Sequence, residues 1–228
     1  MMIIVKNLTK IFHTGQTRLT ALNKINFEVP TGQFLAITGR SGAGKSTALY
    51  QLSLLDTPTE GNIIINGQDV SLVEDQDRIV YRRDNFGFIF QDYALLPTLT
   101  ATENVILPML MQGLSKKSAV EKGHIALEKV DLADKFDNLP SQLSRGEQQR
   151  VSIARSIVHE PKILFADEPT ANLDTESANI ILKIFRQLNK ETNLTLIMVT
   201  HEPDYAKLTD RQIELLDGKI IRDRKNKK

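Results

Sequence analysis

The sequence predicts an α/β fold in which helices cover a mostly parallel sheet. Short β-branched and aliphatic runs alternate with helical patterns along the chain, which is typical of such a sheet. A glycine-rich stretch links one of these runs to a helix. A long segment, residues 95–158, has its apolar residues at helical spacing and contains no convincing strand. We therefore expect a parallel core with an inserted helical subdomain.

The composition is that of an ordinary globular protein. The chain has 228 residues, of which 41% are hydrophobic and 25% charged, and this balance can bury a sizeable core. We expect residues 1–228 to form a single domain. The formal net charge of +1 gives no global field that would attract nucleic acid, so no nucleic-acid partner is expected. The absence of cysteine excludes disulfides, thiolate metal sites and a cysteine nucleophile.

Neither end of the chain predicts insertion into a membrane. The first residues lack the basic and apolar regions of a signal peptide, and the longest apolar runs are far shorter than the roughly 20 residues of a spanning helix. We therefore expect a cytoplasmic chain that acts at a membrane only by binding a protein that spans it. The basic tail, residues 222–228, is expected to be a solvated terminus, with a contact to lipid headgroups as the alternative.

A second, smaller sheet is expected near the start of the chain. Residues 3–12, 25–29 and 62–66 alternate or run apolar between turn signals such as Pro30-Thr31-Gly32 and Asn66-Gly67. Asn-Gly between such runs favours a hairpin. These segments predict a small antiparallel sheet beside the parallel one.

The parallel core is expected from three buried strands. Residues 34–38 form the first strand, which leads through the glycine-rich stretch into a helix over residues 46–55. Residues 163–166 and 196–199 form two further strands, each of which ends in polar residues. Because α/β folds bind ligands at the carboxyl ends of their strands, we expect the functional site there.

The glycine-rich stretch has the pattern of a phosphate-binding loop, G-x-x-x-x-G-K-[ST]. Its glycines let backbone N–H groups surround an anion, Lys45 adds a charge at the outer phosphates, and the Ser46 hydroxyl can bind Mg²⁺. The helix that follows directs its positive end at the same phosphates. The loop predicts a P-loop NTPase core that binds ATP; a plain glycine-rich turn is the alternative. The candidate nucleotide-binding residues are Gly39, Arg40, Ser41, Gly42, Ala43, Gly44, Lys45, Ser46 and Thr47.

Two acidic residues, Asp167 and Glu168, follow the apolar run of residues 163–166. In this position Asp167 can approach a Mg²⁺ ion beside the phosphates, and Glu168 can polarise a water molecule. On its own, a strand that ends in acids is often only a solvated turn. Next to a phosphate-binding loop, it favours a metal-binding and catalytic pair.

The segment Leu143–Arg150, which reads LSRGEQQR, resembles the signature LSGGQQQR of ATP-binding cassette (ABC) ATPases. Other landmarks of that family occur in its order, and the resemblance extends from Met2 to about Ile221. Phe12 matches the aromatic residue that stacks on adenine, and Gln91 matches the Q-loop glutamine. The D-loop and the switch histidine are matched by Asp174 and His201.

Each landmark also has an ordinary explanation when it is taken singly. Phe12 could be a core aromatic residue, Gln91 a surface amide, and Asp174 a cap of the helix that starts near Thr175. A lone histidine such as His201 is usually exposed or caps a helix. We expect that ordinary role for the remaining histidines, which are His13, His124 and His159.

The resemblance implies a head-to-tail homodimer that binds ATP and Mg²⁺ and hydrolyses ATP. ATP then lies between the P-loop of one copy and the signature of the other, while Asp174 crosses the interface. The implied signature contacts are Ser144, Arg145, Gly146 and Glu147. The implied catalytic residues are Glu168, His201 and Gln91. The implied Mg²⁺ ligands are Ser46, Gln91 and Asp167.

Arg145 departs from the signature, which has glycine at that position. Glycine permits a close approach there, whereas arginine adds bulk and a positive charge near the phosphates. If the backbone requires a positive φ at residue 145, the substitution costs on the order of 1 kcal/mol. We expect hydrolysis to survive; a regulatory module that binds ATP without turnover is the alternative.

Residues 95–105 and the segment PTANLD resemble the subfamily of macrolide exporters, lipoprotein-releasing ATPases and the cell-division ATPase FtsE. The resemblance implies export, lipoprotein release or mechanotransmission through an integral-membrane permease subunit, with this chain peripheral on the inner face of the cell membrane. A soluble ABC ATPase is the alternative, and the single cassette disfavours it. Residues that either receive a helix of the permease or pack within the helical subdomain are Tyr93, Leu95, Leu96 and Leu99.

Overall fold

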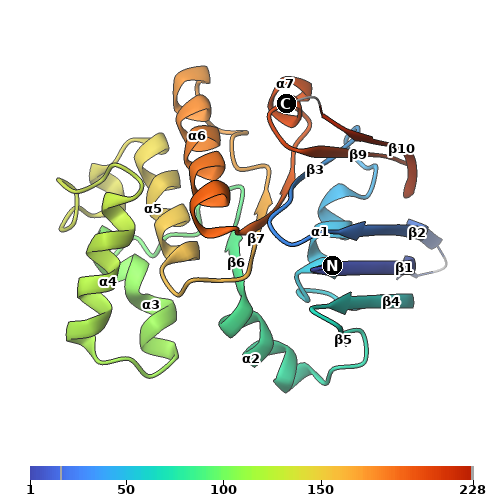
Figure 1. Cartoon of the computed structure of the whole chain (residues 1–228), viewed down its shortest axis with the longest axis horizontal. Helices are drawn as coiled ribbons and strands as arrows, with labels where there is room; N and C mark the ends of the chain where they lie inside the picture. Colours follow the sequence, from blue (N-terminus) through green and yellow to red (C-terminus); the bar gives the residue numbers. More distant parts are fainter. Residues whose placement is uncertain (16, 227–228) are drawn as a thin grey trace.

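A computed structural model describes residues 1–15 and 17–226, and its larger sheet is mostly parallel (Figure 1). The strand order across this sheet is β10-β9-β3-β8-β7-β6, and only the pairing of β9 with β10 is antiparallel. Every residue of β3, β7 and β8 is buried, which is why these strands appear in the sequence as continuous apolar runs. The strands are β3 (Phe34–Thr38), β6 (Phe86–Ile89), β7 (Ile163–Asp167), β8 (Thr195–Val199), β9 (Arg211–Leu216) and β10 (Lys219–Lys225).

The smaller sheet is antiparallel, as predicted, with the strand order β2-β1-β4-β5. Asn66 and Gly67 join β4 to β5 with φ values of 50° and 82°, the backbone of a hairpin turn with positive φ at both central residues. The second strand begins well before residue 25, where it was expected to start. The strands are β1 (Ile3–Thr14), β2 (Thr17–Val29), β4 (Glu60–Ile65) and β5 (Gln68–Asp69).

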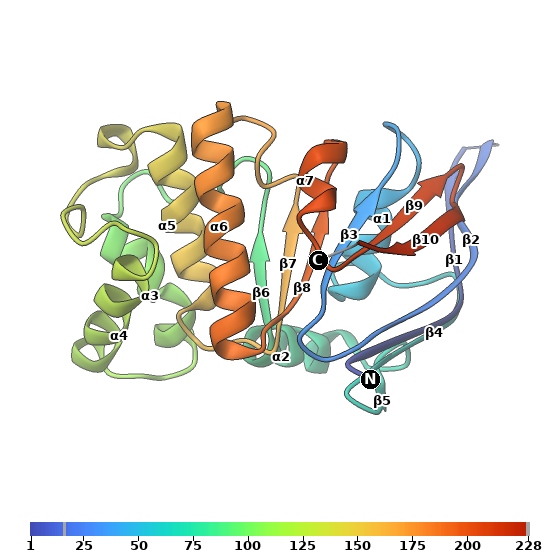
Figure 2. The same ribbon diagram turned by 45° about the horizontal axis from the view of Figure 1, so that its top comes forward.

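The helices divide into a group at one end of the molecule and a group that covers the larger sheet. Three of them, α3, α4 and α5, lie together at the far end from β1 and β2 (Figures 1 and 2) and fall within residues 95–158. Within residues 1–15 and 17–226, no helix is both long and apolar enough to cross a membrane. The helices are α1 (Lys45–Leu52), α2 (Asp75–Asn85), α3 (Ala101–Met111), α4 (Lys116–Glu128), the 3-10 helix η1 (Pro140–Gln142), α5 (Arg145–Ile157), α6 (Thr175–Thr192) and α7 (Pro203–Lys207).

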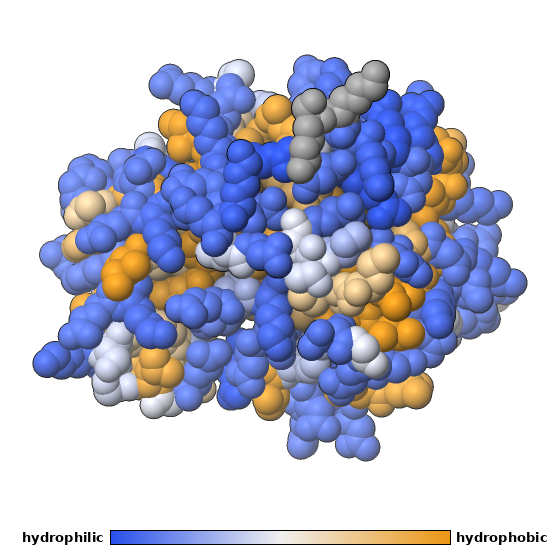
Figure 3. Space-filling view, viewed as in Figure 1, coloured by the Kyte–Doolittle hydropathy of each residue, from blue (hydrophilic) through white to orange (hydrophobic). Residues whose placement is uncertain are grey.

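The larger sheet separates two apolar cores. Along β7, Leu164 and Ala166 pack with α3, α4, α5 and α6 on one face, whereas Ile163 and Phe165 pack with β1, β2, β4 and α1 on the other. Successive side chains of a strand point to opposite faces, so one fully apolar strand serves both cores. The outer surface is mostly hydrophilic on the face that Figure 3 shows, with separate apolar patches.

Some elements differ from the sequence-based expectation. Helix α1 ends at Leu52 rather than at residue 55, because Leu54 has a φ of 59°. The strands β6, β9 and β10 were not expected. Residues 222–225 are exposed, as expected for a solvated tail, but they are also ordered in β10 at the edge of the larger sheet, which was not expected. The last two residues of that basic tail, 227–228, lie outside the described residues.

Two of the three remaining histidines are not simply exposed. His159, after the end of α5, is half-buried, and its Nε2 lies 2.9 Å from the carbonyl oxygen of Phe86. Burial lowers the pKa of His159 below its ordinary value of 6.5. His124 stacks on the ring of Phe136 with the centroids 3.9 Å apart. Only His13 has the exposed position expected for all three.

The lowered pKa of His159 predicts a loss of stability in mild acid. Below about pH 6.5 the unfolded chain binds a proton at this residue that the folded chain resists, so the free energy of unfolding falls as the pH falls. In His159→Gln, whose amide can still donate to Phe86, the fall between pH 7 and pH 5 should be shallower by up to about 1.4 kcal/mol per pH unit. Urea titrations at several pH values measure this, with His13→Gln as the exposed control. If the free energy of unfolding falls equally with pH in the wild type and in His159→Gln, the prediction is contradicted.

Candidate functional site

The phosphate-binding loop joins β3 to α1 through a backbone that requires glycine. Gly39, Gly42 and Gly44 have φ values of 147°, 79° and 96°. A Cβ atom at Gly44 would also lie 2.4 Å from the carbonyl oxygen of Ala21 in β2. Residue 44 therefore has neither the backbone conformation nor the space for a side chain. The tight loop leaves the first N–H groups of α1 without helical partners and available to an anion.

Lys45, the first residue of α1, is buried beneath this loop. Its side chain is 7% exposed, and its Nζ donates a hydrogen bond to the carbonyl oxygen of Arg40 at 3.2 Å. The same Nζ lies 3.8 Å from a carboxylate oxygen of Glu168. A buried ammonium group with a single carboxylate partner has capacity to bind a further anion.

Asp167 lies at the end of β7 beside α1. The Ser46 hydroxyl donates to its Oδ1 at 3.0 Å, and Tyr50 lies one turn further along the same face of α1. Burial raises the pKa of Asp167, and the neighbouring charge of Glu168 raises it further. Burial and the Asp167 carboxylate raise the pKa of Tyr50 to about 12. The sequence analysis missed Tyr50, although its i, i+4 spacing from Ser46 is a signal for a shared helix face.

The hydroxyl and carboxylate oxygens of Ser46 and Asp167 are the donor type that Mg²⁺ prefers. Among the described residues, no group of three or more histidine or acidic side chains is close enough to hold a metal ion. A site with few protein oxygens suits Mg²⁺, which usually keeps water and takes phosphate oxygens from its substrate. The donor set therefore fits Mg²⁺ bound together with a nucleotide.

Glu168 and His201 come together because β7 and β8 are neighbours in the sheet. His201 follows the end of β8 by two residues, and its Nδ1 lies 2.5 Å from Glu168 Oε2. Glu168 has a φ of 46°, a left-handed conformation that is unusual for this residue type, and its backbone N–H donates to Val199 at 3.0 Å. Such backbone conformations concentrate at functional sites.

A cavity of about 480 Å³ lies against these groups. Phe12 lines it and is 40% exposed, so Phe12 is not a core residue. The sequence analysis did not predict that β2 and the β9–β10 turn contribute to this cavity. The lining residues from those segments are Leu19, Thr20, Ala21, Asp217 and Gly218. The predicted residues in the lining are Phe12, Ser41, Gly42, Gly44, Lys45, Ser46, Thr47 and Glu168.

Gln91 is not among the residues that line this cavity. It follows β6, the strand that pairs with β7, by two residues, and it is exposed. Its backbone carbonyl accepts a hydrogen bond from Asn172 at 3.2 Å, which ties the segment after β6 to the segment after β7. The backbone of Gln91 is thus held by the Asn172 side chain, in a segment that follows the strand next to β7.

The signature residues form the start of α5. Ser144 caps this helix: its Oγ accepts from the backbone N–H of Glu147 at 3.2 Å, and the Glu147 carboxylate accepts from the N–H of Ser144 at 2.8 Å. This reciprocal capping box explains why glutamate suits position 147. Gly146 is needed for packing, because a Cβ there would lie 2.9 Å from the hydroxyl of Ser177 in α6.

Arg145 is the first residue of α5, exposed, and not in the positive-φ region. The condition for backbone strain at residue 145, a positive φ, is therefore not met. An arginine in the first turn of a helix has ordinary geometry, because helical residues have negative φ.

The sequence places the chain in a known family. Residues 22–171 match the family model described as ABC transporter. The chain belongs to the ABC transporter family. It is an ATP-binding subunit of an ABC transporter and an ABC-type ATPase, in accord with the cavity that contains the phosphate-binding loop and Glu168.

Individual ABC proteins are similar over most of this chain. It is 46% identical to the lipoprotein-releasing system ATP-binding protein LolD of Aquifex aeolicus over 200 residues, which cover 88% of this chain and 89% of LolD. It is 43% identical to the macrolide export ATP-binding/permease protein MacB of Vibrio parahaemolyticus over 97% of this chain and 34% of MacB. The dimeric structure of the ATP-binding cassette MJ0796 in a post-hydrolysis state with ADP and Pi superposes with a TM-score of 0.92, at 37% identity and full coverage of both chains.

In a single copy of this ABC subunit, the signature does not reach the cavity. No signature residue lines it, and α5 and α1 lie on opposite sides of α6 and β7 in both views (Figures 1 and 2). Asp174 caps α6, as the ordinary explanation had it: its carboxylate accepts from the N–H of Ser177 at 2.9 Å and from the Ser177 hydroxyl at 2.7 Å. A role of Asp174 in a D-loop stays a prediction.

The helical geometry of Arg145 predicts that the family's glycine would be less stable here. In Arg145→Gly, the free energy of unfolding of the nucleotide-free ABC subunit should fall by about 0.5–1 kcal/mol, because glycine loses more backbone entropy in a helix. Arg145→Ala is the matched control and should be close to the wild type. Urea denaturation measures both. A glycine variant more stable than the alanine variant would show that the backbone at residue 145 is strained after all.

Proposed function

We propose that this ABC subunit hydrolyses ATP in a head-to-tail pair of copies, each completing the other's site. The proposal rests on the finding that, within one copy, the signature residues lie apart from the cavity. The cavity contains the phosphate-binding loop and Glu168, whereas Ser144 and Gly146 lie at the start of α5, outside it. The N-terminus of α5 directs its N–H groups and positive dipole outward, which suits a phosphate bound on a second copy. The dimeric form of the similar cassette MJ0796 supports this arrangement.

Within each site, Glu168 is the general base or the group that orients the attacking water. Its Oε2 is held by His201 and its Oε1 lies near Lys45, so the carboxylate has a defined orientation. Phosphates bound at the loop would attract Lys45 and His201, which are the cations and hydrogen-bond donors nearest to Glu168. The carboxylate would then be free to accept a proton from water.

Ser46 and Asp167 hold Mg²⁺ in this proposal, and Gln91 contributes to the same shell from the segment after β6. Bound Mg²⁺ neutralises charge on the phosphate oxygens. The residues of the chain position it: the hydrogen bond from the Ser46 hydroxyl orients the Asp167 carboxylate at the end of β7. Phe12, in the lining of the cavity, provides a ring on which adenine can stack.

An apolar groove on another face suits the membrane partner. The groove has a volume of about 390 Å³ and lies where the end of α1, α2, β6, α3 and α5 meet. Leu55, Ile79 and Met111 in its lining are 43%, 56% and 71% exposed, so several large apolar side chains gather at one solvent-accessible groove. We propose that a cytoplasmic helix of the permease subunit lies in this groove and holds the chain at the inner face of the cell membrane. Export, lipoprotein release and mechanotransmission are the activities that such a partner would determine.

The segment that was expected to receive the permease helix flanks this groove rather than lining it. Arg155 lines the groove and donates hydrogen bonds to the carbonyl oxygens of Tyr93 at 2.8 Å and Ala94 at 2.6 Å. Leu95 packs in part against the core of the helical subdomain, whereas Leu96 is exposed. The exposure of Leu96 therefore supports a contact with the permease helix, whereas the packing of Leu95 supports a place within the helical subdomain.

Glu168→Gln should bind ATP but lose at least about a hundredfold in turnover, because an amide cannot accept a proton from water. With saturating ATP and Mg²⁺ it should also become dimeric, since the sandwich is no longer broken by hydrolysis. Steady-state phosphate release and light scattering measure the two effects. Glu160→Gln, the same change at an exposed residue outside the cavity, is the control. A Glu168→Gln variant that stays monomeric with ATP would contradict the sandwich.

Leu55→Glu and Met111→Glu should release the chain from membranes in cells that also produce its permease subunit, because each change puts a charge into the apolar groove. Fractionation of those cells measures the membrane-bound share, which should fall severalfold. Leu72→Glu is the control, because Leu72 is 80% exposed and lies outside the groove. Equal retention of all three variants on membranes would rule out this groove as the docking site.

A further inference from the structure

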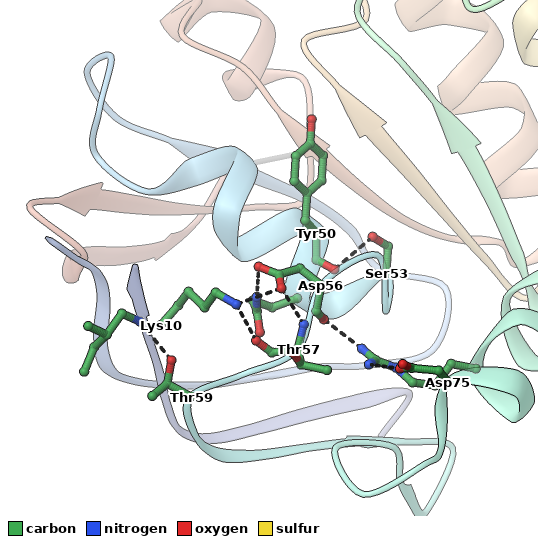
Figure 4. A network of polar contacts seen from close by, with 10 residues as sticks. Lys10, Tyr50, Ser53, Asp56, Thr57, Thr59 and Asp75 are labelled. Carbon is green, nitrogen blue, oxygen red and sulfur yellow. Dashed lines mark hydrogen bonds and ion pairs between the residues drawn. The ribbon is translucent and has the colours of Figure 1, made fainter. Parts of the chain in front are cut away.

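Asp56, in the loop after α1, joins three elements of the fold (Figure 4). Its carboxylate accepts hydrogen bonds from Lys10 of β1 at 2.7 Å and from Gln51 of α1 at 2.8 Å. Its backbone carbonyl accepts from Arg78 of α2 at 2.9 Å. The ammonium group of Lys10 also donates to the carbonyl oxygen of Thr57 at 2.8 Å. The position of the Lys10 ammonium group is thus determined by several contacts.

The Lys10 side chain is largely withdrawn from solvent, whereas its partner Asp56 is partly exposed. The Lys10 side chain is 12% exposed and that of Asp56 32% exposed. A lysine in that position has lost most of its freedom to move and much of its hydration, unlike a lysine in a surface ion pair. The ion pair with the Asp56 carboxylate offsets the lost hydration of the ammonium group and holds it in one place.

The same ammonium group lies over the ring of Phe12, 5.0 Å from the ring centroid. A cation at this distance from an aromatic face is attracted by the electrons of the ring. Phe12 also lines the nucleotide cavity and is 40% exposed. The ring therefore has Lys10 against it and is open to the cavity as well.

We propose that Lys10, held by Asp56, is a positioning residue for the nucleotide base: it fixes the Phe12 ring in the orientation in which adenine stacks on it. This inference rests on the proposed function, which places adenine against Phe12. A partly exposed ring without a neighbour can turn about its side-chain bonds, and binding must then pay the entropy of ordering it. A ring already ordered by a cation binds the base with a smaller loss of entropy.

The proposal predicts a base-specific effect. Lys10→Met keeps most of the aliphatic stem but removes the charge, and it should raise the KM for ATP by about 3- to 10-fold with kcat within about twofold of the wild type. The affinity for inorganic tripolyphosphate, which has no base, should stay within about twofold when measured by calorimetry. Lys10→Arg, which retains a cation for Asp56 and for the ring, should recover most of the affinity for ATP.

Phe12→Ala provides the reference. This variant should raise the KM for ATP at least as much as Lys10→Met does, and the double variant should be no worse than Phe12→Ala alone, because Lys10 acts through the ring. Asp56→Asn removes the charge that holds Lys10, so it tests the same role. It replaces Lys10→Met if that variant does not fold well enough to assay. It should raise the KM for ATP while sparing tripolyphosphate.

The outcomes separate the positioning role from the proposed function. If Phe12→Ala raises the KM but Lys10→Met and Asp56→Asn do not, the positioning role is overturned and the adenine contact stands. An equal loss of tripolyphosphate affinity, or an additive loss in the double variant, also overturns it, because Lys10 would then act on the phosphate site or on the fold. If Phe12→Ala leaves the KM unchanged, the adenine contact is wrong and the positioning role falls with it.

Discussion

The site depends on one row of paired residues across the parallel sheet. Val199 of β8 pairs with Ile37 of β3 on one side and with Asp167 of β7 on the other. Because parallel strands end at the same edge, this row sets the phosphate-binding loop, the acidic pair and His201 side by side. Asp167 lies in this row, Glu168 lies one residue beyond it, and Gly39 and His201 lie two residues beyond it. A small shift in register would therefore move these groups by a residue spacing and separate Glu168 from Lys45 and His201.

The two apolar cores on either side of that sheet position different parts of the site. The core shared with β1, β2 and α1 holds the phosphate-binding loop against β2, which is why Gly44 meets the carbonyl oxygen of Ala21. The other core holds α3, α4, α5 and α6 and presents the capped start of α5 away from the cavity. The cavity and the capped start of α5 therefore lie apart in one copy, and from this separation we propose that a second copy completes the site.

Several features of the site oppose the stability of the chain on its own. Asp167 is a buried carboxyl group whose pKa is raised, Glu168 has a left-handed backbone, and Leu55, Ile79 and Met111 expose apolar surface. Each feature costs free energy in the isolated chain. Each is also the kind of cost that a ligand or a partner can offset, since binding then restores a counter-charge or buries the exposed surface.

The sequence alone determined the features that depend on neighbouring residues. Continuous apolar runs identified β3, β7 and β8, and residues 39–47 and 167–168 identified the phosphate-binding loop and the acidic pair, because periodicity and glycine placement are local properties. The Asp217-Gly218 turn, with φ values of 48° and 72°, was also readable as a hairpin signal and was missed. The four residues of β6 are too few to establish a period.

Only the tertiary structure decided which distant segments meet. Leu19, Thr20 and Asp217 line the same cavity as the phosphate-binding loop, the Ser46 hydroxyl donates to Asp167, and the Lys10 ammonium group contacts both Asp56 and Phe12. It also showed that Arg145 has ordinary helical geometry and that the apolar groove lies beside, not along, residues 93–99. These contacts join residues far apart in the chain, and they follow from how the two sheets and the helices pack rather than from any local pattern.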